Sequence, residues 1–158
     1  MDIGTLLFSF EGRLNRAKYW LAVLTYFVAA IILALLGFMA DQIVGGVGLI
    51  YGIVGTVVYV ALLFSGVAVG IKRLHDRAKS GWWLLVFYVL PTVIILIGTF
   101  LSWSTRSMAI SGLCSLLAMA ISIWGFVELG CLRGSVGPNR YGPDPLPESA
   151  APIQRPAA

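Results

Sequence analysis

The stretch Ile71-Lys-Arg-Leu-His-Asp-Arg-Ala-Lys-Ser-Gly-Trp-Trp83 is a short polar segment between two long apolar runs. It carries four of the eleven basic residues and the only histidine of the chain. In so apolar a chain, charged side chains at this density must lie where water or lipid headgroups can solvate them. The stretch therefore predicts that the chain turns at a membrane surface, between two membrane-spanning helices.

The composition supports a membrane protein. The 158 residues are 59% hydrophobic and only 11% charged, whereas soluble domains carry about 25% charged residues. The net charge is +4, but the basic residues stand at the ends of apolar runs rather than along one continuous face. That distribution is typical of orientation signals and of contacts with anionic lipids. We therefore do not expect nucleic acid as a partner.

Four apolar runs are long enough to cross a hydrocarbon core of roughly 30 Å as helices. We predict an all-α, polytopic membrane protein in which four transmembrane helices form a bundle. Asn15 is the predicted N-cap of the first helix, and Pro91 is expected to kink the third. The expected spans are residues 19–40, 47–71, 82–101 and 108–132.

The remaining segments are short. Residues 1–18 form either an amphipathic piece in the interface or a loosely ordered leader. The Gly/Pro-rich residues 133–145 predict successive turns, and residues 146–158 predict a disordered tail. Cys114 and Cys131 lie too far apart on one helix for a disulfide. We expect them to be free thiols packed as small apolar groups, and we expect no metal site and no cofactor.

The distribution of basic residues predicts the orientation. Four spans place both termini on one side, together with ten of the eleven basic residues, and Arg106 alone lies on the other side. The positive-inside rule then places both termini and the 71–83 stretch in the cytoplasm. The loops that contain Asp41 and Arg106 are expected to face outward.

Three segments resemble one family when taken together and in this order. They are Phe8-Ser-Phe-Glu-Gly-Arg-Leu-Asn-Arg-Ala-Lys-Tyr-Trp20, the polar stretch 72–83, and Gly137-Pro-Asn-Arg-Tyr-Gly-Pro-Asp-Pro145. The chain resembles the domain of unknown function 805 family of small bacterial inner-membrane proteins over residues 6–145. The resemblance implies a four-helix domain in the bacterial inner membrane and no established reaction or cofactor. Ala78 departs from the pattern, since many members have glycine there.

All three segments fall on the predicted cytoplasmic side, where they can form one polar cap. Such a cap either satisfies helix ends and long charged side chains only, or binds an anionic group through its arginines. The candidate partners are anionic lipid headgroups, an envelope protein or a second copy of the chain. The candidate binding residues are Arg13, Arg16, Arg73, His75, Asp76, Arg77, Asn139, Arg140 and Tyr141.

Helical spacing predicts the neighbours of the acidic residues. Asp76 is one turn from Lys72, Arg73 and Lys79, so we expect it to lie beside them. Glu128 is the one acidic residue within an expected span, and we expect it to pair with Arg133. These charges give the cap both acidic and basic groups.

Our preferred reading is a non-catalytic membrane protein, with two alternatives kept open. A small transporter or channel subunit would use intramembrane ionisable groups, for which Glu128 is the candidate, with Tyr59 and Tyr88 among the side chains that either line a cavity or simply pack. An enzyme would use His75 and Asp76 as an acid/base pair. Against that reading, adjacent residues of a helix point about 100° apart.

Small residues recur in the second span. Gly48-x-x-x-Gly52 and Gly66-x-x-x-Gly70 let helices approach closely in lipid. The favoured interpretation is packing against the other spans, and the alternative is a homodimer through this face.

Overall fold

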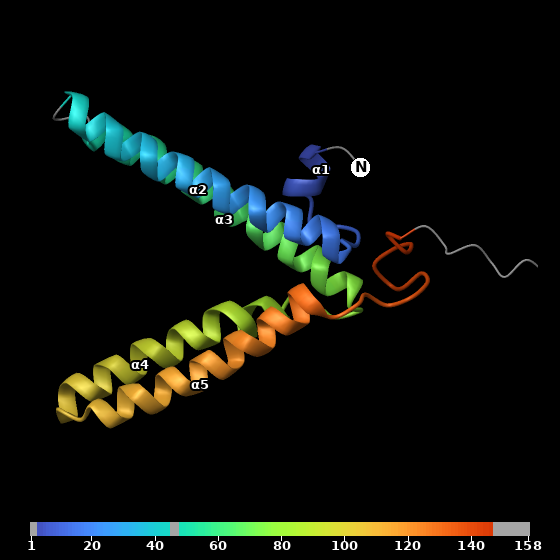
Figure 1. The fold of residues 1–158 in the computed structure, drawn as a ribbon. Coiled ribbons are helices and arrows are strands. Elements are labelled where there is room, and N and C mark those ends of the chain that lie inside the picture. Colours follow the sequence, from blue (N-terminus) through green and yellow to red (C-terminus); the bar gives the residue numbers. More distant parts are fainter. Residues whose placement is uncertain (1–2, 45–47, 147–158) are drawn as a thin grey trace, which may run out of the picture.

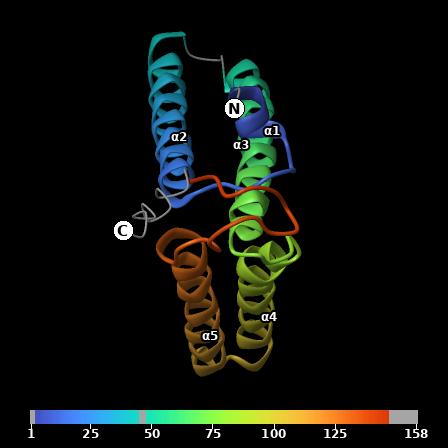
Figure 2. The same cartoon turned by 90° about the vertical axis from the view of Figure 1, so that its right-hand side faces the viewer.

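The computed structural model describes residues 3–44 and 48–146, and in these ranges the chain is helical, without strands. Helices α2 (Arg16–Val44) and α3 (Gly48–Asp76) form one hairpin, and α4 (Leu90–Thr105) and α5 (Met108–Phe126) form the other (Figure 1). A π-helical turn, η1 (Leu85–Val89), leads into α4, and a second, η2 (Val127–Cys131), extends α5. The short helix α1 (Ile3–Phe8) lies beside α3 (Figure 2).

The predicted all-α membrane fold is confirmed. Within the described residues, four helical stretches are long and apolar enough to span a membrane: Arg16–Ala40, Tyr51–Asp76, Leu85–Thr105 and Met108–Cys131. The second of these continues without a break from its apolar part through the charged residues up to Asp76. Its basic residues therefore stand on the last turns of a helix rather than in a loop.

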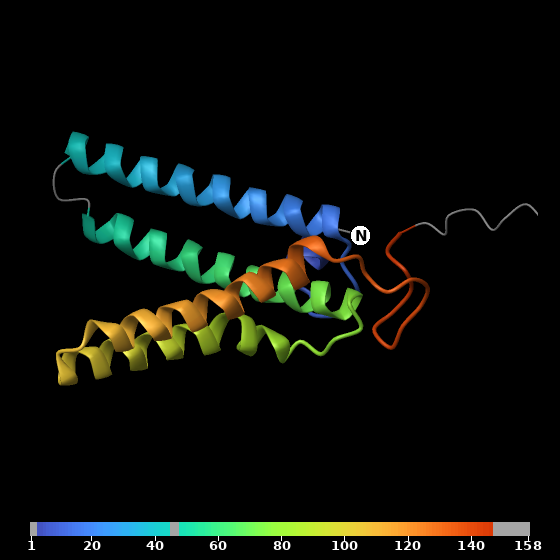
Figure 3. The same ribbon diagram turned by 60° about the horizontal axis from the view of Figure 1, so that its bottom comes forward.

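The two hairpins diverge from a common end. Within each hairpin the two helices pack along each other, whereas the hairpins meet where η2 packs on α2 and α3 (Figures 1 and 3). We call this common end, formed by residues 12–16, 72–84 and 128–146, the polar end. Away from it, large apolar side chains are exposed, for example Phe27 at 63%, Leu96 at 64% and Trp103 at 79%. Such surfaces are stable against hydrocarbon and not against water.

The core lies at the polar end and contains charged groups. Leu14, Leu74 and Leu129 are buried there, at most 2% exposed. Lys72 and Arg73 are each 0% exposed. Fully buried lysine and arginine are rare unless their charges are paired or hydrogen-bonded. The hydrogen-bond partners of Lys72 and Arg73 therefore show which segments these two side chains hold together.

Pro91 lies in the first turn of α4, shortly after the π-helical turn η1, and the kink expected there stays a prediction. Proline has no N–H to donate to the carbonyl four residues earlier, and η1 ends two residues before it. The N–H of Leu90 instead donates to the carbonyl of Leu85, five residues back.

The ends of the described chain follow the predictions in part. Residues 133–146 form turns without a helix, as expected. Both cysteines are free, but Cys131 is exposed at the end of η2 and not packed, so that part of the expectation is wrong. The predicted disordered tail lies outside the described residues from 147 onward. Asp41 was expected in a loop, but it lies within α2, which continues to Val44, so that expectation is wrong.

Candidate functional site

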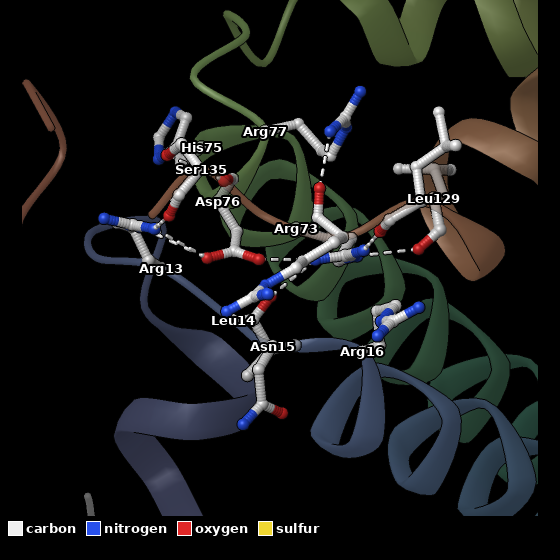
Figure 4. Close-up of polar contacts among 12 residues, drawn as sticks. Arg13, Leu14, Asn15, Arg16, Arg73, His75, Asp76, Arg77, Leu129 and Ser135 are labelled. Atoms are coloured by element: carbon white, nitrogen blue, oxygen red, sulfur yellow. Dashed lines mark hydrogen bonds and ion pairs between the residues drawn. The ribbon is translucent and has the colours of Figure 1, made fainter. Parts of the chain in front are cut away.

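An ion pair network in the interior of the polar end joins two of the three motif segments. The Arg13 guanidinium donates from Nε and Nη2 to Oδ1 of Asp76, at 3.2 and 3.1 Å. Arg73 Nη1 donates to the other oxygen, Oδ2, at 2.5 Å (Figure 4). All three residues are at most 5% exposed. One buried carboxylate thus lies between two buried guanidinium groups.

The third motif segment is tied to the same network. Arg13 donates to the carbonyls of Gly137 and Ser135, at 2.6 and 2.5 Å. The N–H of Ser135 donates to the carbonyl of Asp76 at 2.7 Å. The loop after η2 is therefore held against α3 by Arg13, which comes from the segment before α2.

The end of the last helix is capped by side chains from the first hairpin and from the turn that follows it. A helix leaves its last carbonyls without partners and carries a partial negative charge at this end. Here the five consecutive carbonyls of residues 129–133 all accept hydrogen bonds. Arg73 donates to the carbonyls of Leu129 and Leu132. Trp20 donates to the carbonyl of Gly130, Arg16 to that of Cys131 and Arg77 to that of Arg133.

This arrangement explains why basic residues crowd the motif segments. Arg73 alone bonds to Leu129, Leu132, Leu14 and Asp76, which uses most of the donor capacity of a guanidinium. Cations at a helix C-terminus are stabilising, and in lipid an unsatisfied carbonyl is costly. The buried arginines are thus part of the structure that joins the hairpins.

Glu128 has partners different from the one expected. It accepts from Arg77 Nε and Lys79 Nζ, each at 3.0 Å, so the predicted pair with Arg133 is wrong. Arg133 instead contributes its backbone carbonyl to Arg77. The turn after α3 carries Lys79 toward α5, and for this reason Lys79 does not pair with Asp76 either.

Lys72 also turns away from Asp76. Its Nζ donates to the carbonyls of Thr5, at 2.9 Å, and Leu6, while Ser65 donates to the carbonyl of Leu7 at 2.9 Å. The carbonyl end of α1 is thereby satisfied against the apolar part of α3. The described part of the segment before α2 therefore contains a short helix that is bonded to α3.

His75 and Asp76 point in different directions, as their spacing predicts. The His75 ring stacks on Tyr141, with centroids 3.8 Å apart and planes 4° from parallel. Arg140 lies over the Tyr141 ring at 4.7 Å, and Asn139 Nδ2 donates to the His75 carbonyl at 3.0 Å. With both oxygens of Asp76 bonded to arginines, this geometry offers no acid/base pair.

Two local details follow from the backbone. Asn15 caps α2, as predicted, by accepting from the N–H of Lys18 at 2.9 Å. Ala78 has φ 56°, a left-handed conformation that costs a residue with a Cβ about 1–2 kcal/mol. Glycine would adopt this conformation without that cost.

Asp144 orders the loop of the third motif. Its carboxylate accepts from the N–H groups of Leu146 and Gly137, at 3.0 and 2.9 Å. These two bonds hold the pKa of the Asp144 carboxyl below its usual range. The pKa is lower in the folded chain, so the bonds stabilise the loop above the ordinary pKa of aspartate, and this stabilisation is lost as the pH falls through the lowered value.

A second group of cations lies at the edge of the polar end and is exposed. We call Arg16, Lys18 and Arg133 the basic rim; all three side chains are exposed. Arg16 and Arg133 line one small hollow of about 30 Å³ together with Asp144. The N–H groups of Arg16 and Ala17 begin α2 and have no carbonyl one turn earlier within the helix. A helix start of this kind attracts anions.

All nine predicted binding residues lie at the polar end, but in different settings. Arg13, Arg73 and Asp76 are buried, and Arg16 and Arg140 are exposed. The sequence-based set omitted Trp20 and Ser135. It also omitted the backbone carbonyl groups of η2, because backbone acceptors cannot be recognised from a sequence. Within residues 3–44 and 48–146, no three His, Cys, Asp or Glu side chains are grouped so that they could hold a metal ion.

Comparisons with known proteins agree with the fold. The family model described as "Protein of unknown function (DUF805)" matches residues 7–143. The inner membrane protein YhaH of Escherichia coli is 29% identical over 137 residues, 86% of each chain. The E. coli protein YiiR is 29% identical over 148 residues, 91% of this chain and 90% of its own, and the inner membrane protein YhaI is 29% identical over 136 residues, 86% and 85%. No solved structure matches the chain.

Proposed function

Because the chain belongs to the DUF805 family, whose description names no function, we propose a function from the geometry of the chain itself. The protein is a non-catalytic inner-membrane protein with its polar end in the cytoplasm. There, the basic rim binds the anionic headgroups of membrane lipids. The observation that carries this proposal is the division of the cations into a buried, fully bonded set and an exposed set.

The exposed set has the chemistry that a headgroup requires. Arg16 donates to one carbonyl, of Cys131 at 2.9 Å, and keeps further N–H groups for a ligand. Lys18 and Arg133 make no side-chain hydrogen bond or ion pair within the described residues. A phosphate at the start of α2 would meet the positive end of the helix as well as Arg16 and Arg133, which line the same hollow.

Orientation supports the same placement. The basic residues gather at the polar end, and Arg106 stands at the other end of the hairpins. By the positive-inside rule the polar end faces the cytoplasm, where anionic lipids give the membrane surface a negative potential. An envelope protein or a second copy of the chain with an acidic surface would meet the same rim.

The geometry does not favour the alternative functions. Glu128, the candidate for an ion pathway, is 4% exposed and bonded to two cations at the polar end. The second alternative, an enzyme using His75 and Asp76, lacks a free carboxylate at that position. The contacts of Glu128 and Asp76 therefore support neither transport nor catalysis.

The test is a rim variant with Arg16→Gln, Lys18→Gln and Arg133→Gln, compared with Arg106→Gln, which removes one cation at the far end. Each cation near an anionic surface contributes about 1 kcal/mol. The rim variant should therefore bind phosphatidylglycerol about a hundredfold more weakly, with only a small loss of stability from the lost bond between Arg16 and the Cys131 carbonyl. The measurement is the ratio of phosphatidylglycerol to phosphatidylethanolamine that co-purifies in mild detergent.

An unchanged lipid ratio in the rim variant would contradict the proposal, as would an equal change in Arg106→Gln. Arg13 and Arg73 are unsuitable as probes, because their loss would leave Asp76 and several carbonyls without partners. A lipid loss in such variants would report unfolding of the polar end.

A further inference from the structure

A cleft separates the two hairpins next to the polar end. One part of it, about 500 Å³, lies between α2 and α3 on one side and the start of the second hairpin on the other, and is lined by Tyr26, Tyr59, Gly66 and Leu85. A second part, about 400 Å³, is lined by Tyr19, Thr92, Ser122 and Phe126. Tyr88 lines both parts, so the two cavities adjoin at this side chain, and together we call them the cleft.

The cleft has the size and lining of a ligand site. Ligand pockets are typically about 300–1,000 Å³ and mostly apolar with a few polar groups. Here the polar groups are the hydroxyls of tyrosine, threonine and serine, and no ionised side chain lines either part within the described residues. The hairpins diverge from the polar end (Figure 3), and the cleft lies between their apolar membrane-spanning parts. Its occupant must therefore be apolar and must enter from the hydrocarbon.

The cleft also begins beneath the basic rim. Tyr19 lines it, and Arg16 lies one turn earlier on the same face of α2. Leu129 lines it as well, two residues before the carbonyl to which Arg16 donates. A molecule with an apolar chain in the cleft would thus carry its polar head to Arg16, where the surroundings are positive.

We propose that the cleft holds an acyl chain of a phospholipid whose anionic headgroup lies against the basic rim. The proposal rests on the proposed function for the headgroup and adds the site of the chain. The argument is charge complementarity: an anionic head joined to an apolar chain matches a positive rim joined to an apolar cleft. Such a lipid would stay with the protein longer than the lipids around the outer faces.

Substitutions that fill the cleft test this inference. A Cβ added at Gly66 would meet no atom within 4 Å, and the same is true at Gly112, which lines no part of the cleft. Gly66→Leu should therefore fill the cleft without a clash, and Gly112→Leu is its matched control. Ser122→Leu fills the other part, at the cost of one bond within its own helix.

The probe is phosphatidylglycerol supplied in vesicles with phosphatidylethanolamine, and native mass spectrometry counts the lipids retained by the purified full chain. We expect Gly66→Leu and Ser122→Leu to lose the retained lipid and Gly112→Leu to keep it. Circular dichroism and thermal unfolding of each variant show whether the fold is intact. Full retention in the folded cleft variants would overturn the inference.

Two further outcomes separate the inference from the proposed function. If the cleft variants lose lipid and the rim variant keeps the same preference for phosphatidylglycerol, the site of the chain stands and the headgroup proposal fails. If the rim variant loses the preference and the cleft variants retain lipid, the headgroup proposal stands and the cleft inference fails. A dimer that Gly66→Leu converts into a monomer, without retained lipid, would show that a second copy fills the cleft.

Discussion

Asp76 is the residue on which the polar end depends most. It is 3% exposed and bonds to two guanidinium groups that are themselves buried. Removing one charge from a buried ion pair leaves the remaining charge without compensation, which costs far more than the pair itself contributes. With two arginines present, the loss of the carboxylate leaves two such charges.

We therefore expect Asp76→Asn to lower the free energy of unfolding by about 3–5 kcal/mol, although the side chain keeps its shape. The measurement is thermal unfolding in detergent and again in a bilayer. Glu11→Gln is the control, because Glu11 is an exposed carboxylate that forms no ion pair within the described residues. Equal melting temperatures for the two variants would contradict a structural role for Asp76.

Some of these residues could be predicted from the sequence and some could not. The cap by Asn15 follows from a local rule, and so does the ion pair between Arg73 and Asp76, one turn apart. Arg13 meets Asp76 from 63 positions away, and no local rule reaches that far. The charges of the motif segments predicted a shared cap, but burial depends on which segments close over it.

At the scale of elements, the two hairpins differ in how closely their helices pack. In the second hairpin, a Cβ on Gly98 of α4 would lie 2.5 Å from the Cβ of Cys114 on α5. Only a glycine allows this approach, and close packing is the main source of helix association in lipid. The small residue thus stabilises the pairing of α4 with α5.

Gly98→Ala should destabilise the protein by about 1–3 kcal/mol, since the added methyl group forces the two helices apart. Gly112→Ala on the same hairpin is the comparison, because its Cβ would meet open space. That variant should be neutral or more stable by up to about 1 kcal/mol, since alanine has the higher helix propensity. Thermal unfolding of both proteins measures the difference, and a neutral Gly98→Ala would contradict the packing account.

Helices could be predicted from the sequence where the length of an apolar run and the residues at its ends determine where the helix begins and ends. Four spans and the N-cap of the first follow from such features. The turn η2 does not, because its form depends on arginines and a tryptophan from another hairpin that bond to its carbonyls. Helix α1 was ambiguous for a similar reason: six residues form a stable helix here because Lys72 and Ser65 satisfy its carbonyls.

At the scale of the whole molecule, the arrangement of the four spans depends on contacts between residues that are far apart in the sequence. The sequence predicts how many helices cross the membrane. It does not predict how these helices pack, because apolar helix surfaces in lipid have no hydrophobic driving force that favours one arrangement. The structure places the joining contacts at the polar end, through charged, polar and apolar groups, and leaves the far ends of the hairpins apart (Figure 1). The cleft, and with it the proposed lipid site, exists because the hairpins diverge.

Distances between spin labels in a bilayer measure this divergence most directly. One pair, Leu36→Cys with Leu113→Cys, lies far from the polar end on α2 and α5. The other pair, Leu21→Cys with Ile123→Cys, lies near the polar end on the same two helices. All four native side chains are exposed, and the background carries Cys114→Ala and Cys131→Ser. We predict a clearly longer distance for the far pair than for the near pair. Equal distances for the two pairs would show a closed, parallel bundle and would contradict both the divergence and the cleft.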